Sequence, residues 1–99
     1  MPHYLIEYAD NGDAAARERL RASHIAYRVA AGDRLLLAGP LLDENEVATG
    51  SIILLEADNE DRASTWAAAD PLVEAGVLSV TSLRRMRVAS LMGRKAQLP

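Results

Sequence analysis

Asp70 is a carboxylate on a stripe that the sequence predicts to be the buried side of a helix. Ala63, Trp66 and Ala67 recur at the i, i+3, i+4 spacing of a helix face packed on a core, and Asp70 continues this stripe at i+7. A desolvated carboxylate without a hydrogen-bonding or charged partner is costly. We therefore expect Asp70 to have such a partner inside the fold.

His24 is the best partner for Asp70 that the sequence offers. It lies on the apolar stripe of the first predicted helix, in register with Leu20, Tyr27 and Ala31. A carboxylate beside a histidine fixes the ring tautomer and stabilises the charged ring, so the other ring nitrogen can take or give a proton. Such a pair supports proton transfer next to a carbonyl, isomerisation, or elimination from a small cyclic substrate, and it needs no nucleophile.

Both residues also have a purely structural interpretation. Pro71 disfavours the α conformation in the residue before it, so a helix should end near Ala69. Asp70 then has the right type to cap a second short helix, with Pro71 at its first position and Gly76 just past its end. His24 alone could be a core histidine bonded to a backbone carbonyl. Cap and acid–base partner can coexist, and both remain open for Asp70.

The remaining candidates concern substrate binding and metals. Arg21 lies one helical turn before His24 and is the better anion-binding candidate, whereas Arg84, Arg85 and Arg87 are more typical of a solvated strand edge. No paired spacing completes a metal ligand set around the two histidines, so we expect no metal and no cofactor. The predicted substrate-binding residues are Arg21, Tyr27, Gly39, Pro40 and Leu72.

The composition is that of an ordinary globular chain. The 99 residues make one domain, over residues 1–99, and the net charge of −3 argues against nucleic acid as a partner. There is no cysteine, which excludes disulfides and thiol chemistry. No stretch resembles a signal peptide or a membrane span, so we expect a cytoplasmic protein with a small-molecule ligand, with neither nucleic acid nor membrane as a partner.

The hydrophobic pattern predicts six elements in the order βαββαβ. Strands are expected at residues 3–9, 34–38, 51–57 and 78–88, with the second broken by Gly39-Pro40 and followed by a polar loop at residues 43–46. One helix should end near Ala31, before Gly32, and the other should run from Asp58 or Asn59 to the Asp-Pro turn. This is an α+β, ferredoxin-like fold: a four-stranded antiparallel sheet with both helices on one face. The tail from about residue 89 is predicted to be mobile or to lie across a neighbour.

Two of the predicted strands are apolar on both faces. Residues 35–38 (LLLA) and 52–55 (IILL) show no alternation, so both of their faces need cover. Two helices of this size cover one face of the sheet only. The simplest cover for the other face is a second sheet, and the sequence therefore predicts a homodimer formed through the sheet face.

Several short motifs extend from the first helix into the last strand. In chain order they are Arg21-Ala-Ser-His24, Gly32-Asp-Arg-Leu-Leu-Leu-Ala-Gly-Pro40, Gly50-Ser51, Trp66-Ala67 and Asp70-Pro-Leu-Val-Glu-Ala-Gly-Val77. In this order and spacing they resemble the YCII-related family of the dimeric α+β barrel superfamily. In that family a His on the first helix and an Asp at the Asp-Pro turn are taken to form a catalytic pair, which matches His24 and Asp70.

The chain departs from the family pattern at two places. Leu72 stands where the family usually has an aromatic residue after Asp-Pro, and an Arg-rich strand end replaces a common Pro-Phe pair. Because some members of the family are linked to the breakdown of aromatic compounds, the resemblance implies a lyase or isomerase acting on a small cyclic or aromatic-derived compound. The alternative is a non-catalytic module that binds a small ligand on the same dimeric scaffold.

Overall fold

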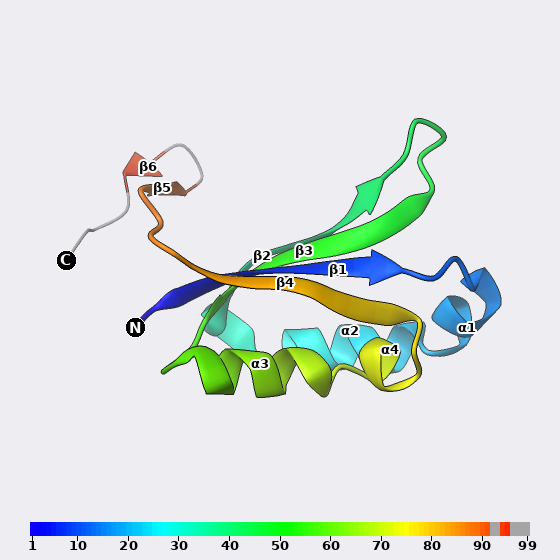
Figure 1. The fold of residues 1–99 in the computed structure, drawn as a ribbon, viewed down its shortest axis with the longest axis horizontal. Coiled ribbons are helices and arrows are strands. Elements are labelled where there is room, and N and C mark those ends of the chain that lie inside the picture. The colour runs from blue at the N-terminus through cyan, green and yellow to red at the C-terminus, as the bar shows by residue number, and fades with distance from the viewer. Residues whose placement is uncertain (92–93, 96–99) are drawn as a thin grey trace.

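The chain forms a four-stranded antiparallel sheet with its helices on one face, an α+β, ferredoxin-like arrangement (Figure 1). The computed structural model describes residues 1–91 and 94–95, and the strands of the sheet follow the order β2-β3-β1-β4. The elements are β1 (His3–Asp10), α1 (Ala14–Arg19), α2 (Arg21–Val29), the 3-10 turn η1 (Gly32–Arg34), β2 (Leu35–Leu42), β3 (Ala48–Glu56), α3 (Glu60–Ala68), α4 (Pro71–Glu74), β4 (Leu78–Met86), β5 (Ser90–Leu91) and β6 (Arg94–Lys95).

The first predicted helix is two segments, and it ends earlier than expected. Leu20, with φ −99° and ψ 3°, lies between α1 and α2, and α2 ends at Val29. The hydrogen bonds from Leu20 N to Ala16 O and from His24 N to Leu20 O still connect the two segments across the kink. Ala16 of α1 is buried in the core, and Leu20, at the junction of the two segments, packs against it.

The prediction that Gly39-Pro40 breaks the second strand was wrong. β2 continues through both residues to Leu42, and Pro40 is paired with Ser51 of β3. Proline lacks an N–H and is tolerated on edge strands, where that side needs no ladder partner. Because β2 is the outer strand beside β3, the sheet accommodates Pro40, and the pairing with β3 keeps one register from Leu37 to Leu41. The predicted polar loop is the β2–β3 hairpin connection, in which Asp43 Oδ1 accepts from Asn45 N and Val47 N.

The core lies between the helices and the inward face of β1 and β3. Alternate residues of β1 point toward the helices, and the antiparallel register sets each opposite an inward residue of β3, so that Tyr8 faces Ser51. A Cβ on Gly50 would lie 2.3 Å from the Tyr8 carbonyl oxygen, so this position requires glycine. The largest fully buried side chains are Tyr8, Ile6, Ile53, Leu55, Leu72, Leu78, Val77 and Asp70.

The opposite face of the sheet carries apolar side chains that no helix covers. Leu5 and Leu54 are paired across β1 and β3, out of phase with the inward residues, and Leu37 of β2 is paired with Leu54. Leu37 is 52 % exposed, although it lies in the middle of an apolar run. The non-alternating strands therefore present a second apolar face, as the sequence indicated.

The chain after β4 is described only in part. β4 ends at Met86, two residues before the predicted limit, and β5 and β6 pair antiparallel in a separate two-stranded sheet. The rest of the predicted mobile tail, residues 92–93 and 96–99, lies outside the described residues. Within the described chain, no helix has the length and apolar character needed to cross a bilayer.

Candidate active site

The turn from α3 into α4 fixes Asp70 as a helix cap. Its backbone is extended, with φ −60° and ψ 131°, and its Oδ1 accepts a hydrogen bond of 2.9 Å from Leu72 N. Pro71 occupies the first position of α4, and Gly76, with φ 78°, follows the end of the helix. The capping interpretation of Asp70 is therefore correct, and it leaves the carboxylate with further acceptor capacity.

The structure also brings His24 and Asp70 together. His24 Nδ1 lies 2.9 Å from Oδ1 and 2.9 Å from Oδ2 of Asp70. Burial raises the pKa of Asp70, but its hydrogen bonds from His24 and Leu72 and the nearby charges of His24 and Arg28 outweigh burial, so its pKa lies below the usual value. An ionised carboxylate only accepts hydrogen bonds, so we assign the donated proton to Nδ1.

Arg28 completes the environment of the carboxylate, and the sequence analysis did not select it. Its Nε donates to Asp70 Oδ2 at 3.1 Å and its Nη1 donates to Ser51 Oγ at 3.1 Å. Ser51 Oγ in turn donates to Gly39 O at 3.2 Å, which ties the cluster to β2. Arg28 is four residues after His24, so both lie on one helix face. This i+4 spacing is the feature of the sequence that could have identified Arg28 as a neighbour of the His24 site.

Tyr8 lies beneath Arg28 and adds a second polar group to the buried cluster. The Arg28 guanidinium carbon is 5.1 Å from the centre of the Tyr8 ring, a cation–π contact. Burial, reinforced by the charge of Asp70, raises the pKa of Tyr8, so its hydroxyl stays protonated. Tyr8 Oη and Arg28 Nη2 are buried without a hydrogen-bond partner in the described part of the chain.

The other predicted site residues are dispersed. Arg21 and Pro40 are exposed, whereas Leu72 is fully buried in the hydrophobic core. Gly39 contributes its carbonyl to Ser51, as described above. Tyr27 turns toward α3: its hydroxyl donates to Trp66 O at 2.8 Å, and the two ring centres are 5.2 Å apart. Burial, followed by the charge of Asp70, raises the pKa of Tyr27.

Only one member of the His24–Asp70 pair is accessible. The His24 side chain is 14 % exposed, whereas that of Asp70 is 0 % exposed. Among the described residues, His24 Nε2 has no hydrogen-bond partner. The arrangement can therefore exchange a proton with a bound molecule through Nε2 while Asp70 holds the ring from behind. No three His, Cys, Asp or Glu side chains in the described ranges are grouped to hold a metal ion.

Comparisons with known proteins place the chain in a family and find a solved protein of similar fold. The family model of the YCII-related domain matches residues 1–87. Protein YciI of Escherichia coli O6:H1 is 34 % identical over 90 residues, and the match covers 82 % of this chain and 92 % of that protein. A Haemophilus influenzae protein is 38 % identical over 84 residues, and the match covers 75 % of this chain and 86 % of that protein. The dehydrochlorinase TftG from Burkholderia phenoliruptrix AC1100, solved with 2,5-dihydroxybenzoquinone, has a similar fold, with a TM-score of 0.68 at 23 % identity over 88 % of this chain and 92 % of that one.

Proposed function

Because the chain belongs to the YCII-related family, we propose that it is a small acid–base enzyme in which His24 and Asp70 transfer a proton on a cyclic or aromatic-derived compound. The observation that carries this proposal is the hydrogen bond from His24 Nδ1 to a carboxylate that is fully buried, while the imidazole remains accessible. The reaction class is elimination or isomerisation, since both begin with the removal of a proton from carbon or oxygen.

The two residues have different roles in this mechanism. In its neutral form, His24 donates a hydrogen bond from Nδ1–H to the ionised carboxylate of Asp70 and keeps that proton, which leaves the Nε2 lone pair available to take a proton from the substrate. The resulting imidazolium is stabilised by the carboxylate behind it. In an elimination the leaving group departs with the bonding electrons, and the proton passes from Nε2 to water. In an isomerisation Nε2 returns the proton at another position. Asp70 is a positioning residue, because it cannot reach the substrate.

The protein with the similar fold supports the choice of reaction. TftG is named a 5-chloro-2-hydroxyhydroquinone dehydrochlorinase, and removal of HCl is a proton transfer coupled to loss of a leaving group. A His–Asp pair can supply this chemistry without a nucleophile. The substrate class proposed for this chain is accordingly a small cyclic compound with an acidic C–H or O–H group.

The test measures proton transfer directly. Chloride release from 5-chloro-2-hydroxyhydroquinone and deuterium incorporation into 2,5-dihydroxybenzoquinone from D₂O are followed with wild type and His24→Gln. We expect His24→Gln to lower the enzymatic rate about 10²–10⁴-fold, the range for loss of a general base. Arg19→Gln, an exposed arginine at the end of α1, is the matched control and should keep the wild-type rate.

Two outcomes would reject the catalytic role. One is a His24→Gln rate equal to that of wild type. The other is a wild-type protein that binds these compounds without turning either over, and that result would favour a non-catalytic small-ligand-binding module.

The uncovered apolar face supports a second copy of this chain as partner. Leu5 and Leu37 lie on that face and keep exposed surface, which a sheet-on-sheet contact would bury. We expect light scattering at micromolar concentration to give about twice the 10.7 kDa chain mass. A folded protein of single-chain mass under these conditions contradicts the dimer and leaves the proton-transfer proposal standing.

A further inference from the structure

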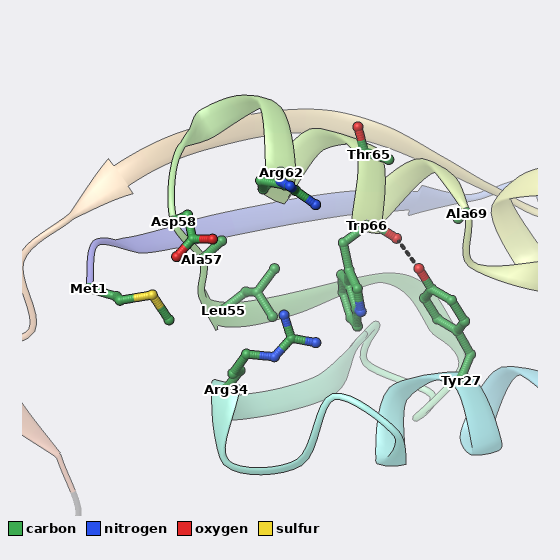
Figure 2. Close-up of a pocket in the computed structure, with 10 residues that line it drawn as sticks. All are labelled: Met1, Tyr27, Arg34, Leu55, Ala57, Asp58, Arg62, Thr65, Trp66 and Ala69. Carbon is green, nitrogen blue, oxygen red and sulfur yellow. Dashed lines mark hydrogen bonds between the residues drawn. The ribbon is translucent and has the colours of Figure 1, made fainter.

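A cleft separate from the His24–Asp70 contact opens between η1, β3 and α3. Its volume is ≈ 290 Å³, just below the usual range for ligand pockets, about 300–1,000 Å³. Figure 2 shows the Trp66 ring extending from α3 toward the strand beneath, with Leu55 on the opposite wall. This size suits a ligand with one ring.

Aromatic side chains close one end of the cleft. Tyr27 and Trp66 are in contact, with their rings inclined by 31°, and the Tyr27 hydroxyl is bonded to the Trp66 carbonyl. Leu55, which is 1 % exposed, makes the opposite wall apolar. A flat apolar ring placed here would contact the indole ring of Trp66 and would displace only water.

Two guanidinium groups from different elements enter the same cleft. Arg34 comes from η1 and Arg62 from α3, and both line the cleft; Figure 2 shows Arg34 directed toward the Trp66 ring and Arg62 lying along α3 above it. Arg34 Nε is anchored by a hydrogen bond of 3.4 Å to Ala31 O. Neither arginine forms an ion pair with another described residue. Asp58, at the Met1 end, is the acidic side chain among the described lining residues, so cationic groups outnumber it.

We propose that this cleft is a binding site for a small aromatic carboxylate. The ring lies against Trp66, and the carboxylate lies between Arg34 and Arg62. Guanidinium groups match the planar geometry of a carboxylate and form charge-assisted hydrogen bonds with it, while the indole favours a flat ring. The site adjoins the His24–Asp70 contact, because Tyr27 is three residues after His24 and Trp66 is four before Asp70. It uses neither residue of that pair and does not rest on its catalytic role.

The protein carries its own reporter for this site. Trp66 is the only tryptophan in the chain, so its fluorescence reports on the cleft. Benzoate is titrated into the full-length protein, with calorimetry as a second readout, beside neutral benzamide and non-aromatic cyclohexanecarboxylate. We expect benzoate to bind and to change the emission, benzamide to bind at least about tenfold more weakly because it lacks the charge, and cyclohexanecarboxylate to bind more weakly because it lacks the ring.

Matched variants separate the site from its surroundings. Arg62→Gln and Arg34→Gln should each weaken benzoate binding about tenfold or more, and both should leave benzamide binding unchanged. Arg19→Gln and His24→Gln should bind benzoate as wild type does. No benzoate binding at about 10 mM, equal affinity for benzoate and benzamide, or unchanged binding in both Arg62→Gln and Arg34→Gln overturns the proposal. Loss of benzoate binding in His24→Gln would instead place the ligand at the acid–base pair.

Discussion

The buried cluster around Asp70 and the cleft beside Trp66 use the same residue types in opposite ways. In the cluster, Arg28 lies over the Tyr8 ring and its charge is matched by Asp70. In the cleft, Arg34 and Arg62 lie beside Trp66 without an acidic partner among the described residues. Both places combine guanidinium groups with aromatic rings in the layer between the helices and the sheet.

Burial explains the difference. Arg28 is 8 % exposed, and a charge removed from water at that depth must be paired and hydrogen-bonded within the fold. Arg34 and Arg62 are exposed, so water can solvate them until an anion arrives. The cluster is thus preorganised by internal contacts, whereas the cleft keeps its hydrogen-bonding capacity for a ligand. Substitutions should therefore affect folding at the first place and binding at the second.

The largest expected effect is that of Asp70→Ala on stability. This change removes the cap of α4 and leaves the buried Arg28 without its counter-ion. Breaking a buried pair in this way costs about 3–5 kcal/mol in free energy of unfolding. Urea denaturation followed by circular dichroism measures the loss.

Asp58→Ala in the cleft is the matched control for that measurement. Asp58 is exposed, and a surface substitution of this kind should change the free energy of unfolding by no more than about 0.5 kcal/mol. Equal losses for Asp70→Ala and Asp58→Ala would contradict the contrast between the two regions.

The pH dependence of stability should show a smaller effect of Asp70. Its pKa in the folded chain is below the ordinary 3.8, so the unfolded chain takes up the proton first as the pH falls. The stabilisation is therefore full above that ordinary value and is lost as the pH falls through the folded pKa. Asp70→Asn keeps the capping oxygen but cannot titrate. We expect the stability difference between wild type and Asp70→Asn to shrink below about pH 4, in urea titrations from about pH 6 to 2.5. A difference independent of pH would show that the carboxylate is not held ionised.

Much of the fold and part of the site could be predicted from residue patterns. The four strands, the helices on one face and the Asp70 cap follow from periodicity and from the residues at helix ends, which are local signals. The strand break predicted at Gly39-Pro40 was wrong because proline is tolerated in a strand at the sheet edge, and strand order is not a local property of the sequence.

Arg28 and the cleft show where local reasoning ends. The i+4 spacing from His24 to Arg28 can be read from the sequence. The hydrogen bonds that bring Arg28 into the site are made to Ser51 of β3 and to Asp70 after α3, and both residues are far from Arg28 in sequence. Arg34 and Arg62 look like ordinary surface arginines in the sequence. They form a site only because η1 and α3 place them around one tryptophan.

The smallest expected effect concerns the contact between Tyr27 and Trp66, which closes one end of the cleft. Tyr27→Phe removes the hydrogen bond to Trp66 O and keeps the ring in contact with Trp66, so the free energy of unfolding should fall by about 0.5–1.5 kcal/mol. Benzoate affinity should stay near that of wild type, because the ring wall remains. Tyr27→Ala removes that wall as well and should weaken benzoate binding further than Tyr27→Phe does. If both variants bind benzoate equally well, Tyr27 is not part of the cleft wall, and the ligand position proposed beside Trp66 must be moved toward Arg34 and Arg62.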